Sequence, residues 1–117
     1  NIRVRLLMTS GCIEYWFMLH FKDCAPPTQT EADKNNLVKD VKKFISIYKK
    51  GDKDSIWQIA PNYPTAVKYA KKRLQNISEI PCIEDTDERN QWLCKYCVTF
   101  STVFEALDFL ESLSSVA

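Results

Sequence analysis

The motif in this chain that most closely matches a known chemistry is Cys94-Lys95-Tyr96-Cys97. A Cys-x-x-Cys pair supports redox chemistry when it begins a helix, because the helix dipole lowers the pKa of a thiol. Here the motif lies well inside an apolar pattern, so that activation is missing. A zinc site would need further ligands from Cys82 with Cys12, Cys24 or His20, and no second close pair of ligands exists. We therefore expect core cysteines, with no metal and no cofactor.

The sequence has few other residues or motifs arranged for catalysis. His20 is the single histidine, and no Gly-x-Ser-x-Gly motif accompanies it. The acids from Glu84 to Glu88 lack the alternating pattern and central glycine of a calcium loop. Gly11 and Gly51 lie too far apart to form a phosphate-binding loop. These observations predict a protein that is not an enzyme.

Aromatic residues suggest a binding role instead. The chain holds 3 Trp, 5 Tyr and 6 Phe, which is a large apolar load for a small core. Trp16, Met18 and His20 share one face of an expected strand, and aromatic groups on partly covered faces are typical interface anchors. With Trp57, they form the partner-binding surface that we predict. The leading hypothesis is a non-enzymatic interaction or regulatory module that binds another protein or itself.

Basic residues support an alternative function, nucleic-acid binding. Residues 30–73 carry 11 Lys or Arg against 5 Asp or Glu, whereas residues 74–117 carry 2 against 8. Such a division can attract an acidic partner, and Tyr48 and Tyr69 could stack on bases. The plainer interpretation is that lysines fill the solvent faces of two helices. The candidate contacts are Lys42, Lys43, Lys49, Lys50, Lys68, Lys71, Lys72 and Arg73.

The elements that must position these residues begin with a predicted β-hairpin. Apolar residues alternate in residues 2–6 and again in residues 13–21, and Thr9-Ser10-Gly11 supplies turn residues between them. A helix is then expected from a capping box at Thr28–Glu31 through an apolar stripe that reaches Tyr48, with Gly51 as its stop.

The second half of the chain is expected to be mainly helical. Residues 55–60 fit either a short helix or a short strand, and Pro64 suits the first turn of a further helix that runs to Ile77. Apolar residues from Thr86 to Leu113 predict one long helix with an apolar arc so broad that other elements should surround it. The alternative is a strand at residues 92–100 followed by a helix that opens at Thr102–Glu105.

Together these elements predict a single domain over residues 1–117 of the α+β class. We expect it to be predominantly helical, with an N-terminal β-hairpin packed on three to four helices. The alternative is a small three-stranded sheet covered by helices. The hydrophobic fraction of 45% and charged fraction of 26% are typical of soluble globular proteins. No apolar run is long enough to span a bilayer, so no membrane partner is expected, and the odd count of five cysteines favours an intracellular location.

Overall fold

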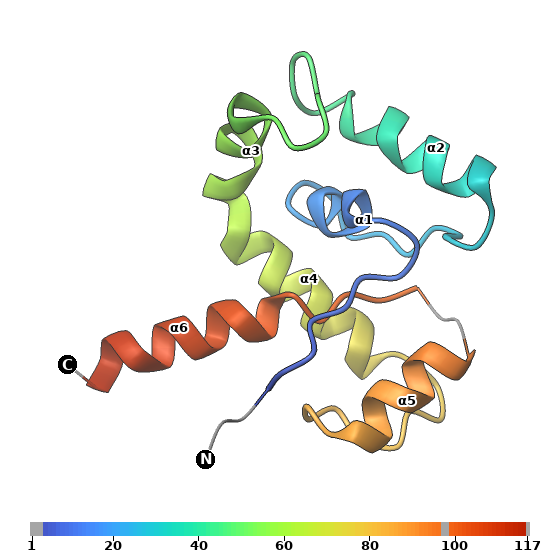
Figure 1. Ribbon diagram of the computed structural model, residues 1–117, viewed down its shortest axis with the longest axis vertical. Coiled ribbons are helices and arrows are strands. Elements are labelled where there is room, and N and C mark those ends of the chain that lie inside the picture. The colour runs from blue at the N-terminus through green and yellow to red at the C-terminus, as the bar shows by residue number, and fades with distance from the viewer. Residues whose placement is uncertain (1–3, 97–98, 117) are drawn as a thin grey trace.

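The computed structural model describes residues 4–96 and 99–116, and the described part is built from helices (Figure 1). In chain order these are α1 (Ile13–Met18), α2 (Glu31–Val41), α3 (Lys53–Ile59), the short 3₁₀ helix η1 (Ala60–Asn62), α4 (Tyr63–Gln75), α5 (Asp87–Tyr96) and α6 (Phe104–Val116). Helix α1 packs against α2 and α4, and α4 packs against α6. No strand is present among the described residues, so the predicted α+β class is wrong.

The predicted N-terminal hairpin is wrong, since residues 13–18, in its second half, form α1. Alternation indicates a strand most clearly when one face is polar, and here the second face is only partly polar because Trp16 and Met18 lie on it beside Glu14. Tyr15, Trp16, Met18 and Leu19 are all buried, so a short helix surrounded by other elements accommodates them. The expected strand face carrying Trp16, Met18 and His20 does not exist.

The first half of the predicted hairpin is not helical, but it pairs with a different part of the chain. Thr9 forms an isolated antiparallel bridge with Ser101. The amide of Ser10 donates to the carbonyl of Phe100 at 2.9 Å, and the amide of Thr102 donates to the carbonyl of Met8 at 2.7 Å. A segment at the start of the chain thus runs beside one near its end, as Figure 1 shows at the centre of the molecule.

Helix α2 is shorter than predicted. Its N-cap is Thr30, whose hydroxyl accepts from the amide of Asp33 at 3.1 Å, and Asp33 completes a capping box two residues later than expected. The helix ends at Val41, and residues 42–51 form turns and bends. Ile45 and Tyr48 are nevertheless buried, so the apolar stripe identified core residues without identifying their local structure.

Two segments in the middle of the chain are helical. Residues 53–59 are helical with Asp52 as the cap, rather than a short strand. Pro64 lies in the first turn of α4, as predicted. Ala66, Ala70 and Leu74 bury one face of α4 against the core, which also contains Leu93 of α5 and Phe104 of α6.

Neither prediction for residues 86–113, the one long helix or the strand followed by a helix, is right. The expected long helix is divided into α5 and α6, and residues 92–96 are helical rather than a strand. The new helix does begin just after Thr102, where the alternative placed it. However, the Thr102 hydroxyl accepts from the amide of Met8 at 2.9 Å, so tertiary pairing uses the side chain that was expected to cap the helix.

Candidate protein-interaction surface

The N-terminal segment, Val4–Gly11, passes between α5 and α6 and is bordered by hollows on more than one side. Val4 and Leu6 line a hollow of about 420 Å³ together with Asp85 and Asp87 at the start of α5. Leu7 lines a second hollow of about 420 Å³ against α6. A third, of about 470 Å³, is bordered by residues 7–11 and by Leu93, Cys94 and Phe100. Much of this segment is therefore accessible to a binding partner.

The hollow beside α6 is mainly apolar and has large exposed side chains around it. Phe109 is 47% exposed and Leu110 is 57% exposed, and Leu7 beside them is also exposed. Leu113 lies three residues beyond Leu110, on the same side of the helix, and is exposed too. We call Leu7, Phe109, Leu110 and Leu113 the α6 apolar surface.

Helix α6 exposes these residues because only its first half packs on the rest of the molecule. Phe104 is buried, while Leu107 is only partly buried against the core. The C-terminal half extends away from the other helices (Figure 1). An apolar helix face without a covering element is a typical feature of an interaction site.

Charged groups around the surface are mostly acidic. The Arg5 guanidinium stacks over the Phe109 ring at 5.6 Å and lies 3.7 Å from a carboxylate oxygen of Asp85. Asp108 pairs with Lys71 of α4 at 2.9 Å. Asp87 has no ion-pair partner among the residues that the structure describes. A partner with basic groups beside apolar ones would complement this rim.

A fully buried arginine fixes the two helices that frame the surface. Arg89 of α5 donates both terminal nitrogens to the Glu105 carboxylate of α6, at 2.9 and 2.8 Å. It also donates to the carbonyl of Ile83 at 2.7 Å and lies 3.5 Å from Asp85. This paired geometry suits a guanidinium because two parallel hydrogen bonds match a carboxylate. Nothing in the sequence distinguished Arg89 from a solvent-exposed residue.

The predicted partner-binding residues are mostly in the interior. Trp16, Met18 and His20 are buried, which corrects their assignment to a surface. His20 places its ring edge-on to Trp16, and its Nδ1 lies 2.9 Å from the Trp16 carbonyl oxygen. Burial lowers the pKa of His20 below its ordinary value. Trp57, on α3, is 67% exposed and is the member of the predicted set that lies at the surface.

Four of the eight predicted nucleic-acid contacts form ion pairs with carboxylates. Lys43 pairs with Asp40 at 3.1 Å, Lys50 with Glu14 at 3.5 Å, Lys71 with Asp108 at 2.9 Å and Lys72 with Asp23 at 2.6 Å. Arg73 is partly buried and donates through Nε to the Thr99 carbonyl at 2.7 Å. Lys42, Lys49 and Lys68 have no ion-pair partner within the described chain.

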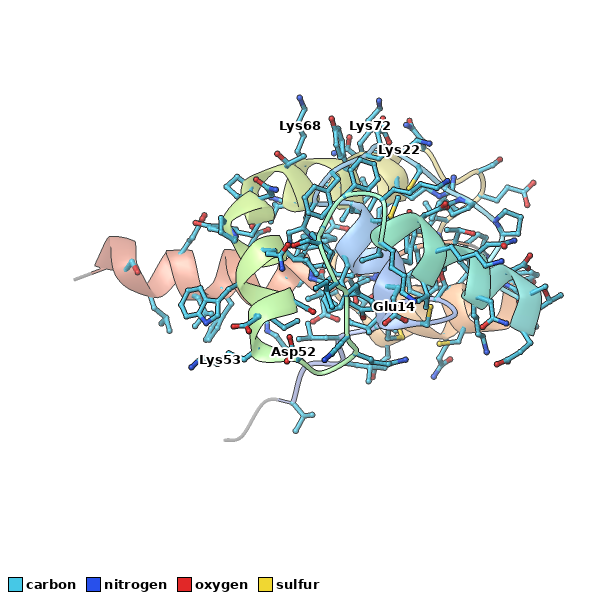
Figure 2. The ribbon with its side chains drawn as sticks, turned by 90° about the horizontal axis from the view of Figure 1, so that it is seen from above. Glu14, Lys22, Asp52, Lys53, Lys68 and Lys72 are labelled. Carbon is cyan, nitrogen blue, oxygen red and sulfur yellow. The ribbon has the colours of Figure 1, made fainter. Side chains whose placement is uncertain are left out.

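Two of the predicted contacts, Lys68 and Lys72, project from the same side of the molecule, near Lys22 (Figure 2). Tyr48, proposed as a base-stacking ring, is buried. Tyr69 is partly buried, with the Lys68 ammonium 5.9 Å from its ring centre. Base stacking would require these rings to be uncovered.

The sequence patterns did not identify one buried carboxylate. Glu14 of α1 is fully buried, and Tyr48 donates its hydroxyl to Glu14 Oε2 at 2.5 Å. Burial by itself would raise the pKa of Glu14, but hydrogen bonds from Tyr48 and Cys12 and the charge of Lys50 lower it overall. Oε1 has no hydrogen-bond partner in the described chain, although Lys50 lies nearby. The contact joins α1 to the loop of residues 42–51, which gives Glu14 a structural role.

Two cysteines, Cys12 and Cys24, have thiols of raised pKa. Burial, followed by the neighbouring Glu14, raises the pKa of Cys12, and burial raises that of Cys24. A raised pKa leaves less of the reactive thiolate near neutral pH. Cys94 lies in the last turn of α5 with its sulfur 3.5 Å from that of Met8, and Cys97 lies outside the described residues. Within those residues, no three His, Cys, Asp or Glu side chains are grouped as metal ligands.

The model of the RloB-like protein family matches residues 1–105 of the chain. No curated protein and no solved structure matches it. In the described part of the chain, none of the helices has the length and apolar character that crossing a membrane requires.

Proposed function

The chain belongs to the RloB-like protein family, and we propose that within it this chain is a non-catalytic interaction module. It binds another polypeptide through the α6 apolar surface and the adjoining N-terminal segment. The family description names no activity, so the proposal depends on the chain's own residues.

The observation that supports the proposal is that α6 is rich in apolar residues although other elements do not surround it. The sequence predicts that residues 86–113, which include most of α6, carry an apolar arc broad enough to be enclosed by other elements. Yet Phe109, Leu110 and Leu113 stay about half exposed beside a hollow of about 420 Å³. Fully burying such a side chain stabilises by roughly 1.5–3 kcal/mol, so covering the exposed half of each contributes about half of that. A partner that covers them accounts for their retention on the surface.

The buried titratable groups support a structural role for these side chains rather than a catalytic one. His20, Glu14 and Arg89 are buried and are each held by protein partners: a carbonyl, a tyrosine hydroxyl and a carboxylate. A catalytic acid or base needs a position within hydrogen-bonding reach of a substrate. These three groups use their hydrogen bonds to join elements of the fold.

The experiment compares two surface variants with the unmodified chain as immobilised bait. Leu110→Glu introduces a charge at the centre of the α6 apolar surface, and Trp57→Ser removes a similarly exposed side chain from α3, the other predicted binding position. Polypeptides retained from an extract of the source cells are identified by mass spectrometry. Each is then purified and titrated against the three baits.

We expect a polypeptide that binds the unmodified chain and Trp57→Ser alike, and binds Leu110→Glu at least about tenfold more weakly, since hot-spot substitutions cost about 2 kcal/mol or more. Circular dichroism and thermal melting check that both variants fold. Equal binding by Leu110→Glu would refute the proposed surface. Selective loss with Trp57→Ser would move the interaction to α3.

A further inference from the structure

The loop of residues 42–51 carries apolar side chains between two pairs of lysines. From residue 42 to residue 50 its sequence is Lys-Lys-Phe-Ile-Ser-Ile-Tyr-Lys-Lys, with no acidic residue among them. The loop joins α2 to α3 and lies at one end of the molecule's longest axis (Figure 1). An extended surface that approaches this end of the molecule would meet the loop.

Two side chains of the apolar run hold the loop to the core, and two others stay outside. Ile45 and Tyr48 are buried. Phe44 is 44% exposed, although its ring stacks on that of Phe21, and Ile47 is 80% exposed. The loop therefore presents Ile47, and part of Phe44, to the solvent.

The backbone of Ile47 is strained, and contacts on both sides keep it so. Its φ is +52°, a region that β-branched residues rarely adopt. Gln58 of α3 pairs with both backbone groups of Ser46, accepting from the amide at 3.0 Å and donating to the carbonyl at 3.2 Å. The amide of Lys49 donates to the Ser55 hydroxyl at 2.9 Å. The fold thus holds an exposed apolar side chain in a costly conformation, which is a typical feature of a functional position.

The lysines around Ile47 are accessible. The exposed residues of the two pairs are Lys42, Lys43, Lys49 and Lys50. Lys42 and Lys49 have no ion-pair partner within the described chain, and Lys43 and Lys50 remain largely exposed although they pair with Asp40 and Glu14. Residues 39–54 hold six lysines against three aspartates, so the basic excess persists when the flanking acids are counted.

We propose that this loop docks on the surface of an anionic lipid bilayer, with Ile47 inserted at the boundary of headgroups and acyl chains. Lysines near a bilayer are attracted to anionic lipids, and an apolar side chain among them adds the burial that holds a protein at the interface. A nucleic-acid backbone would also attract the lysines, but its phosphates offer nothing apolar to Ile47.

This surface contact differs from the membrane partner that the sequence analysis excluded. That expectation concerned segments that span a bilayer, and docking at the surface requires none. The loop is also separate from the α6 apolar surface, so the inference goes beyond the proposed function and does not depend on it.

The test is cosedimentation with vesicles of phosphatidylcholine alone and with vesicles of phosphatidylcholine and phosphatidylserine in equal parts. Ile47→Asn removes the inserted side chain, and it should fold at least as well because asparagine tolerates the left-handed conformation. Ile83→Asn makes the same change at another exposed isoleucine, on the segment before α5, towards the other end of the molecule (Figure 1). Thermal melting checks that both variants fold.

We expect the unmodified chain and Ile83→Asn to bind the anionic vesicles alike, and Ile47→Asn to bind them about tenfold more weakly. Lys49→Gln should weaken binding about fivefold, whereas Lys95→Gln, on α5, should not. Binding should fall as salt is raised and should be weak on phosphatidylcholine alone.

A chain that does not bind the anionic vesicles, or binds both kinds of vesicle equally, would overturn the proposal. Equal binding by Ile47→Asn and the unmodified chain, or equal losses from Ile47→Asn and Ile83→Asn, would show adsorption by another route and would also overturn it. Binding of a random nucleic-acid probe without binding of vesicles would assign the lysines to phosphates instead. None of these outcomes alters the test of the α6 apolar surface with Leu110→Glu.

Discussion

Gly11 is required for two separable reasons, its backbone angle and its close approach to Thr28. Its φ is +74°, a region that side chains disfavour, and a Cβ there would lie 2.7 Å from Thr28 Cβ and 2.8 Å from its carbonyl oxygen. Gly51 has the same φ of +74° with no atom within 4 Å of the added carbon. The two glycines therefore separate backbone strain from steric conflict.

We predict that Gly51→Ala lowers the free energy of unfolding by about 1 kcal/mol, the cost of a left-handed conformation for alanine. Gly11→Ala should lower it further, by roughly 1–3 kcal/mol beyond the Gly51 variant, because Thr28 must move. Urea denaturation of both variants measures the difference. Equal losses would mean that the Thr28 contact relaxes without cost.

His20 should make stability depend on pH in a defined window. Its pKa is lowered in the folded state, from an ordinary value of 6.5, because burial disfavours the imidazolium. As pH falls below about 6.5, the unfolded chain takes up a proton that the folded chain does not, so folding stability decreases. Above that pH the ring is neutral in both states and contributes no dependence.

The measurement is the melting temperature between pH 8 and pH 5, compared with His20→Asn. We expect the unmodified chain to lose stability below about pH 6.5 and the variant to show a flatter profile there. Below about pH 4.5, protonation of Glu14 adds a separate loss in both proteins, because its folded pKa is also lowered. Identical profiles above that point would contradict the assignment to His20.

At the scale of elements, the contact between α5 and α6 depends on one ion pair in the interior. Glu105→Ala would leave the buried Arg89 guanidinium without its two-point partner, and removing one member of a buried pair costs about 3–5 kcal/mol. Asp108→Ala, one turn further along α6, breaks the half-exposed pair with Lys71 and should cost less than about 1 kcal/mol. Chemical denaturation of the two variants tests this contrast, and a large loss from Asp108→Ala alone would contradict it.

Sequence patterns predicted elements where local rules decided the outcome. Pro64 marked the start of α4, and Thr30 and Asp33 show that a capping box does open α2, two residues after the expected place. The patterns failed where tertiary contacts decided. Residues 13–18 carry large apolar groups on both faces of the predicted strand, so their alternation did not separate a strand from α1. Thr102 pairs with Met8 through a contact between residues 94 positions apart, which no local pattern contains.

The surface that we propose for interaction was only partly predictable for the same reason. The sequence indicated too many large apolar groups for a small core, and that excess is present at Leu110 and Leu113. It assigned the surface to Trp16, Met18 and His20, because alternation in a strand would have exposed one face of residues 13–21. Once those residues form α1, the same side chains enter the core, and the exposed apolar groups are those of a helix that the rest of the chain does not surround.

At the scale of the whole molecule, ion pairs neutralise part of the basic excess of residues 30–73. Basic residues from the first part of the chain meet acids from elsewhere: Lys71 of α4 meets Asp108 of α6, and Lys72 meets Asp23 after α1. Some lysines of the basic region therefore pair with carboxylates from distant positions in the sequence. A one-sided field that would attract nucleic acid is correspondingly reduced.

We therefore predict that the chain binds random single- and double-stranded nucleic-acid probes only weakly. Phosphate contacts require cations that are free to replace counterions, and Lys71, Lys72 and Lys50 would first have to leave carboxylates.

Fluorescence anisotropy at low salt provides the measurement, with Asp23→Asn as a matched variant that releases Lys72 beside Lys22 and Lys68 (Figure 2). We expect Asp23→Asn to bind more tightly than the unmodified chain and with a steeper dependence on salt. Tight, steeply salt-dependent binding by the unmodified chain would mean that the ion pairs do not restrain these lysines, and would favour nucleic acid over a polypeptide as the partner.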